Sequence, residues 1–161
     1  MSIEGIDELL KKFDNVGNLS EDLYKIIDKC GEFVRDDARM RAPVDSGDLK
    51  KSIQHTTTKT ADGAEADIHT NSDHAAFVEF GTGPVGAANH SGTSPNVTPE
   101  YAKEKWLGVV PGLVSDTDKG LRYIAGQKAQ PYLYPALKDN EEQLTEFIKD
   151  ELAKKIKEKA T

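Results

Sequence analysis

The segment from Ala42 to Ile53 constrains the fold more than any other part of this chain, because it ends one element and begins another. Its sequence is APVDSGDLKKSI. Pro43 disfavours helical backbone at the residue before it, so a helix arriving from upstream must stop near Arg41. The Asp-Ser-Gly that follows is turn chemistry, because short polar side chains bond the backbone and glycine tolerates a positive φ. Leu49 lies four residues before Ile53, which predicts a single helical turn before a strand.

Two amphipathic segments precede this turn. Residues 3–13 have apolar positions at helical spacing, and Asn15-Val16-Gly17-Asn18 breaks the pattern. A longer helix is predicted from an N-cap at Ser20 to about Arg41. Its apolar stripe consists of Leu23, Ile26, Ile27, Cys30, Phe33, Val34 and Ala38.

A β-hairpin is predicted after the turn, with strands at residues 52–60 and 64–71. A two-residue Asp62-Gly63 loop pairs Ala61 with Ala64, Thr57 with Ile68 and His55 with Thr70. One face of this hairpin then carries Ile53, Thr57, Ala66 and Ile68. The other carries Thr56, Thr58, Thr60, Glu65, Asp67 and His69. Such sorting is typical of an antiparallel sheet with one buried face.

The second half of the chain is less regular. A short helix is predicted at residues 74–80, with Gly81 as its stop. Residues 83–130 are rich in glycine and proline and are interpreted as a long flexible loop, with a short helix at 99–107 and a second ordered piece at 120–125. An aromatic turn between Pro131 and Pro135 leads to a long C-terminal helix. Its apolar positions are Leu137, Leu144, Phe147, Ile148, Leu152 and Ile156.

These elements predict an α+β fold in a single domain of 161 residues. Helices pack on one face of a small antiparallel sheet, and a long helix stands near each end of the chain. Two strands alone are marginal, so at least one more is expected from residues 107–113 or 123–133.

The composition of the chain limits the classes of function that it can have. The net charge of −7 gives no overall attraction to nucleic acid or anionic lipid. The only cysteine, Cys30, lies on an apolar stripe, which indicates a buried thiol and excludes an internal disulfide. We find no signal-peptide pattern and no apolar stretch long enough for a bilayer, so we expect assembly in the cytoplasm and no membrane partner.

No catalytic or cofactor motif stands out. The glycines at residues 81–86 lack the lysine of a phosphate loop, and the four histidines lack metal-site spacing. We therefore expect no cofactor and no metal. Glu79 is unusual because it lies between Val78 and Phe80. It either faces solvent on a short helix or is held by Arg39 or Arg41 as a structural pair.

Three pieces of sequence, taken together, resemble the head–tail joining and tail-completion proteins of long-tailed phages and prophages. They are Ala42-Pro43-x-Asp45-Ser46-Gly47-x-Leu49-x-x-Ser52-Ile53, then Ala76-x-x-Glu79-Phe80-Gly81-Thr82, then Gln130-Pro131-Tyr132-Leu133-x-Pro135-Ala136-Leu137. The resemblance implies a neck or tail subunit of the virion, with no enzyme activity and no cofactor.

The resemblance also implies partners. It implies a homo-oligomeric ring, for which we expect six or twelve copies. Its neighbours would be portal, adaptor, stopper, tail-terminator or tail-tube proteins, and DNA would pass through without specific binding. Tyr101 and Trp106 are candidate subunit-interface residues, and Glu65 and Asp67 are candidate lumen-facing residues.

Two alternatives stay open. One is a small hydrolase that uses Glu79, His74 or Asp45 in a cleft under the long loop. The other is a protein-binding module that uses the lysine-rich C-terminal helix.

Overall fold

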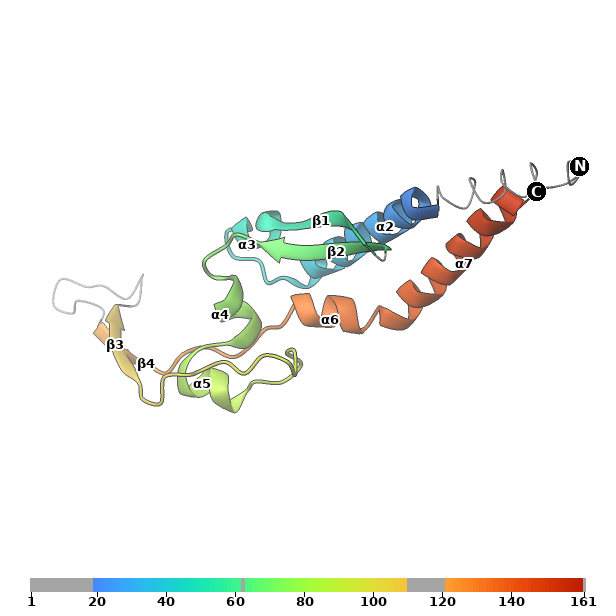
Figure 1. Ribbon diagram of the computed structural model, residues 1–161. Helices are drawn as coiled ribbons and strands as arrows, with labels where there is room; N and C mark the ends of the chain where they lie inside the picture. The colour runs from blue at the N-terminus through green and yellow to red at the C-terminus, as the bar shows by residue number, and fades with distance from the viewer. Residues whose placement is uncertain (1–18, 62, 110–120, 161) are drawn as a thin grey trace, which may run out of the picture. The chain divides into compact units, whose positions relative to one another are not determined.

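The computed structural model describes residues 19–61, 63–109 and 121–160 (Figure 1). They form an α+β fold of six helices and two separate two-stranded antiparallel sheets, which confirms the predicted class. They divide into two compact units. We call residues 19–38, 53–70 and 136–160 the helix–hairpin unit, and residues 39–52, 71–109 and 121–135 the clamp unit. The predicted helix at residues 3–13 lies outside the described residues.

The long helix α2 spans Leu19–Arg41 and ends before Pro43, as the sequence predicts. Four residues of the predicted stripe are buried, namely Ile26, Cys30, Val34 and Ala38, and Gly31 outside the stripe is buried as well. Ser20 lies inside the helix, so its predicted role as the N-cap is wrong. Phe33 belongs to the predicted stripe but is 43% exposed.

The hairpin forms with the predicted faces but a different register. Strands β1 (Ile53–Thr60) and β2 (Gly63–Thr70) pair His55 with Ile68 and Thr57 with Ala66. Because residues 61 and 62 connect the strands, instead of residues 62 and 63, the register is displaced by two residues. A displacement of two keeps the side-chain alternation, so every residue stays on its predicted face.

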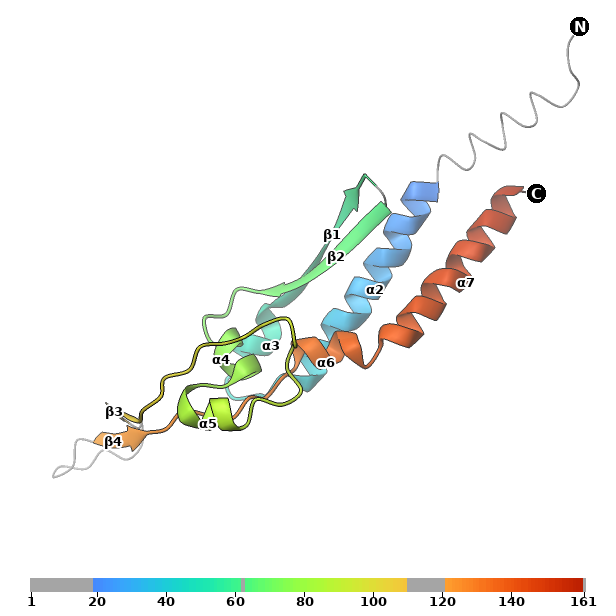
Figure 2. The ribbon, with the colours of Figure 1, turned by 60° about the horizontal axis from the view of Figure 1, so that its bottom comes forward.

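Helix α2 covers the apolar face of the hairpin. A Cβ built on Gly31 would lie 2.8 Å from the Ala66 Cβ, so the absence of a side chain allows this close approach. The C-terminal helix α7 (Glu141–Ala160) is joined to α2 by an ion pair between Lys159 and Asp22 at 2.6 Å. The views agree that α2 lies between the hairpin and α7 (Figure 2).

The clamp unit contains most of the remaining elements. They are α3 (Asp48–Ser52), α4 (Ala75–Phe80), α5 (Gly83–Ala88), β3 (Trp106–Val109) and β4 (Leu121–Ile124). Helix α6 (Leu133–Lys138) begins in this unit and takes the place of the predicted aromatic turn.

The interpretation of residues 83–130 as a loop therefore needs correction, because α5, β3 and β4 lie within them. The helix predicted at 99–107 is wrong, since β3 begins at Trp106. The expected additional strand does form, but β3 and β4 pair with each other and leave β1–β2 as a two-stranded sheet among the described residues. No helix of the described residues is long and apolar enough to cross a membrane.

Candidate functional site

The Glu79 carboxylate forms the centre of the clamp unit. Glu79 is 5% exposed on α4, and its two oxygens accept three backbone N–H groups. Oε2 accepts from Tyr132 at 2.8 Å and Leu133 at 3.0 Å, and Oε1 accepts from Tyr134 at 3.0 Å. These N–H groups belong to the start of α6, where a helix has no acceptors of its own. We call this arrangement the Glu79 clamp.

The sequence left open whether Glu79 faces solvent or is bound by a partner. The structure confirms that the carboxylate is bound, but its partners in the described chain are backbone N–H groups and not Arg39 or Arg41. A signal in the sequence would have pointed to this. Tyr132 directly precedes α6, at the position where Ser, Thr, Asp or Asn would normally cap the helix, so the acceptor must come from elsewhere in the chain.

Backbone bonds join the same two pieces of sequence on either side of the clamp. The Gln130 N–H donates to the Val78 carbonyl at 2.8 Å. The Thr82 N–H donates to the Gln127 carbonyl at 3.0 Å, and the Gln127 N–H donates to the Thr82 carbonyl at 3.2 Å. The structure therefore brings the second and third pieces together, across about fifty intervening residues.

Two glycines allow this close packing. Gly81 has φ +76°, ends α4 as predicted, and leaves no room for a Cβ, which would lie 2.7 Å from both the Ala129 nitrogen and the Gln127 oxygen. Gly126 has φ +92°, and a Cβ there would lie 1.8 Å from the Thr82 oxygen. Both positions therefore need glycine for conformation and for space.

Burial also affects Tyr132, which follows Pro131 and is 1% exposed. Removal from water and the nearby Glu79 charge raise the pKa of its hydroxyl to about 12. The phenol is therefore neutral at physiological pH.

The first piece of the signature forms the predicted turn. Gly47 has φ +84°, and the Asp48 N–H donates to the Ser46 hydroxyl at 3.3 Å. The Lys51 N–H donates to the Gly47 carbonyl at 3.1 Å, which confirms the predicted helical turn, here α3. Asp45 is exposed, while Pro43 and Leu49 are half-buried.

The two aromatic residues proposed for a subunit interface, Tyr101 and Trp106, differ in their contacts and exposure. Tyr101 is half-buried, and its hydroxyl donates to the Phe80 carbonyl at 2.7 Å and contacts His90 Nδ1 at 2.7 Å. Burial raises the pKa of this hydroxyl. Tyr101 therefore attaches the segment before β3 to α4, and a contact of its half-buried ring with a neighbouring subunit stays a prediction. Trp106 is 39% exposed.

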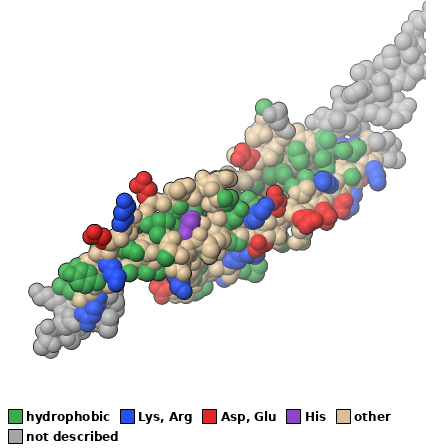
Figure 3. All heavy atoms as spheres, turned by 90° about the horizontal axis from the view of Figure 1, so that it is seen from below, with side chains coloured by type: hydrophobic (Ala, Val, Ile, Leu, Met, Phe, Trp, Pro, Cys, Tyr) green, Lys and Arg blue, Asp and Glu red, His purple; other side chains and the backbone are tan. Residues whose placement is uncertain are grey.

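An exposed apolar surface on the β3–β4 ribbon was not predicted from the sequence. The register pairs Leu107 with Tyr123 and Val109 with Leu121, so these four side chains share one face. They are between 43% and 76% exposed. Figure 3 shows hydrophobic side chains at the surface of this part of the chain. We call these four residues the ribbon face.

The candidate lumen residues lie on the predicted polar face of the hairpin, and their place in a lumen stays a prediction. Glu65 and Asp67 are exposed on β2, on the hairpin face that points away from α2. Neighbouring side chains on this face are polar and exposed as well. They are Gln54, Thr56, Thr58, Thr60 and His69.

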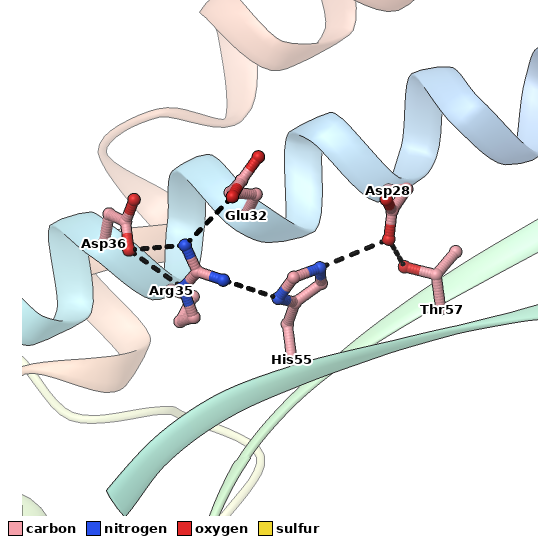
Figure 4. Close-up of polar contacts among 6 residues, drawn as sticks. All are labelled: Asp28, Glu32, Arg35, Asp36, His55 and Thr57. Carbon is pink, nitrogen blue, oxygen red and sulfur yellow. Dashed lines mark hydrogen bonds and ion pairs between the residues drawn. The ribbon is translucent and has the colours of Figure 1, made fainter. Parts of the chain in front are cut away.

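A polar cluster joins α2 to the hairpin (Figure 4). Asp28 Oδ1 contacts His55 Nε2 at 3.2 Å and accepts the Thr57 hydroxyl at 2.8 Å. The Thr57 hydrogen bond, and secondarily His55, lower the pKa of Asp28. Arg35 Nη1 lies 3.2 Å from His55 Nδ1. Because arginine only donates, Nδ1 accepts and the imidazole proton is on Nε2.

This cluster resembles an acid–histidine pair, but it is poorly arranged for catalysis. A catalytic histidine must present one nitrogen to its nucleophile or substrate. Here Arg35 and Asp28 engage both nitrogens of His55. The cluster therefore serves to fix the hairpin on α2.

The alternative functions gain little from the geometry. Both Glu79 oxygens are engaged by backbone, which leaves the postulated hydrolase without that carboxylate. In the C-terminal helix, Lys154 and Lys155 pair with Glu151 and Glu158. Within the described parts of the chain, no group of three or more His, Cys, Asp or Glu side chains converges on a metal position.

Comparison with known families gives one result. Residues 7–81 match the family model described as "Bacteriophage HK97-gp10, putative tail-component". Comparisons with curated proteins and with solved structures found no match. The matched range includes the whole first piece of the signature and most of the second, ending at Gly81, while the third piece lies beyond it. The match, which spans less than half of the chain, confirms the resemblance to a phage tail-component family and supports a structural phage-assembly protein.

Proposed function

We propose that this chain is a structural subunit of a phage virion and forms a ring that joins the head to the tail or completes the head-proximal end of the tail. The match of residues 7–81 to the tail-component family carries the proposal. The Glu79 clamp supports it, because the third piece of the signature, which lies outside the match, docks directly onto the second. The chain therefore holds the second and third pieces together as one connected arrangement.

The ribbon face is the surface that we propose for contact with a neighbouring subunit. A two-stranded ribbon with an exposed apolar face is marginal alone and gains stability by burying that face. Leu107 and Tyr123 are 57% and 76% exposed and lie directly opposite each other, so they form the centre of this surface. Trp106 pairs with Ile124 on the opposite face of the ribbon, so it is not part of the ribbon face.

The polar face of the hairpin is the surface that we propose for the lumen. A conduit for DNA must not bind the phosphate backbone, and acidic and hydroxyl side chains meet this need. Glu65 and Asp67 supply the acidic charge there.

The test of the ring uses the full-length protein. Sedimentation and native mass spectrometry should give a closed oligomer, and antibody labelling of purified virions should place the chain at the neck or tail. The double variant Leu107→Glu and Tyr123→Glu should shift the oligomer to monomer while the circular-dichroism spectrum stays unchanged. Gln54→Glu, which adds one charge at an exposed strand position, is the control. Unchanged assembly of the double variant would remove the ribbon face from the interface.

The test of the lumen reverses charge at both acidic positions. Glu65→Lys with Asp67→Lys should slow genome exit, because lysines would hold the phosphates. Ejection of DNA from purified particles measures the rate. Normal ejection and normal infectivity would remove the lumen assignment but not the structural role.

A further inference from the structure

The clamp unit contains a pocket lined mainly by aromatic side chains, which we call the aromatic pocket. These side chains come from α4, from the segment before β3 and from β3, and they are Phe77, Phe80, Tyr101 and Trp106. Pro99 and Glu100 also line the pocket. Its volume is about 530 Å³, within the range of about 300–1,000 Å³ that is typical of ligand sites.

Packing and hydrogen bonds hold the walls of the aromatic pocket in place. The Tyr101 hydroxyl donates to the Phe80 carbonyl at 2.7 Å. A Cβ built on Gly83 would lie 2.8 Å from the Trp106 ring, so the indole packs directly against the backbone there. Phe77, by contrast, remains 53% exposed. The pocket is therefore preformed but open to solvent, which suits a site that receives a ligand.

The polar groups of the aromatic pocket limit what it can bind. Glu100 is exposed, and within the described residues its carboxylate has no ion-pair partner. The other side-chain oxygens of the lining are already engaged, because the Thr82 hydroxyl accepts the Gln127 N–H and the Tyr101 hydroxyl bonds the Phe80 carbonyl. A ligand therefore meets aromatic surface and one unpaired negative charge.

We propose that the aromatic pocket binds an arginine side chain of a partner protein, with the guanidinium stacked on the aromatic rings and paired with Glu100. A guanidinium stacks on aromatic rings, forms bidentate pairs with carboxylates and is more weakly hydrated than the lysine ammonium. Glu100 would repel the phosphates of a nucleic acid. A sugar would leave most of its hydroxyls without partners there, which is costly. The pocket is complete within one copy of the chain, so arginine binding does not require the proposed ring.

The fluorescence of Trp106 provides a direct test, because it is the only tryptophan in the chain and lines the pocket. The peptide acetyl-Gly-Arg-Gly-amide, titrated into the full-length protein, should change the emission in a saturable way. The same peptide with citrulline in place of arginine keeps the shape without the charge, and it should bind at least about tenfold more weakly. Equal responses to the two peptides, or no response to either, would overturn the proposal. A stronger response to a thymidine oligonucleotide would overturn it as well.

Matched variants test which groups form the arginine site. Glu100→Gln removes the charge and Phe77→Leu removes a ring, and each should weaken binding of the arginine peptide by about fivefold or more. Glu104→Gln and Phe33→Leu change exposed positions outside the pocket and should leave the affinity unchanged. All four positions are exposed, so the thermal unfolding curves should match that of the wild type. Equal affinities in Glu100→Gln and Glu104→Gln would contradict the arginine site, while the oligomeric state, measured separately, decides on the ring.

Discussion

The Glu79 clamp makes the strongest prediction, because three donors depend on one buried carboxylate. In Glu79→Gln the amide has a single acceptor oxygen. Its NH₂ group must then face either the Tyr134 N–H or the N–H pair of Tyr132 and Leu133. At least one buried donor loses its acceptor, and the charge that strengthens the other bonds is lost. We expect a loss of about 2–3 kcal/mol in the free energy of unfolding for Gln, and about 4 kcal/mol for Ala.

Thermal unfolding followed by circular dichroism measures the effect. For a chain of this size, 1 kcal/mol corresponds to about 2–4 °C in Tm, so Glu79→Gln should lower the Tm by about 5–10 °C. Glu146→Gln is the matched control, because Glu146 is exposed on α7, and its Tm should change by less than about 1 °C. A Tm for Glu79→Gln equal to that of the control would refute the view that the clamp holds α6 on α4.

Three further predictions concern pH and backbone. The pKa of Tyr132 is about 12 in the folded protein against about 10 in the unfolded chain. Its contribution of about 2–3 kcal/mol to the free energy of unfolding is therefore complete below pH 10 and is lost as pH rises to 12. Tyr132→Phe should remove this pH dependence of the free energy of unfolding, measured by urea titration between about pH 10 and 12. Gly126→Ala should cost more than about 3 kcal/mol because its Cβ would overlap the Thr82 oxygen, whereas Gly47→Ala, in open space at φ +84°, should cost about 1 kcal/mol in the same assay. Asp28 has a lowered pKa, so its stabilisation is present above about pH 4 and disappears as pH falls below it; Asp28→Asn should destabilise at pH 7, and the difference from wild type should shrink during acid titration.

Local chemistry predicted much of the fold. Pro43 ends α2, Gly81 ends α4, and the alternation along β1 and β2 gives the faces of the hairpin, because each depends on neighbouring residues and steric rules. The predicted register of the hairpin was wrong by two residues, because the sequence offers more than one possible two-residue loop near Gly63. Alternation does not distinguish these registers, as both place the same residues on the same face.

The candidate site depended more on tertiary structure. The sequence by itself singled out Glu79, the turn at Asp45–Gly47 and the segment from Pro131 to Pro135, because each is a local departure from ordinary helix or loop composition. Only the tertiary structure decided that the Glu79 partners are the N–H groups of Tyr132, Leu133 and Tyr134. It also decided that Tyr101 is bonded inward and that the ribbon face is exposed. Every residue carries a backbone N–H, so composition cannot reveal which buried donors need a distant acceptor; that need arises when the packed chain removes them from water.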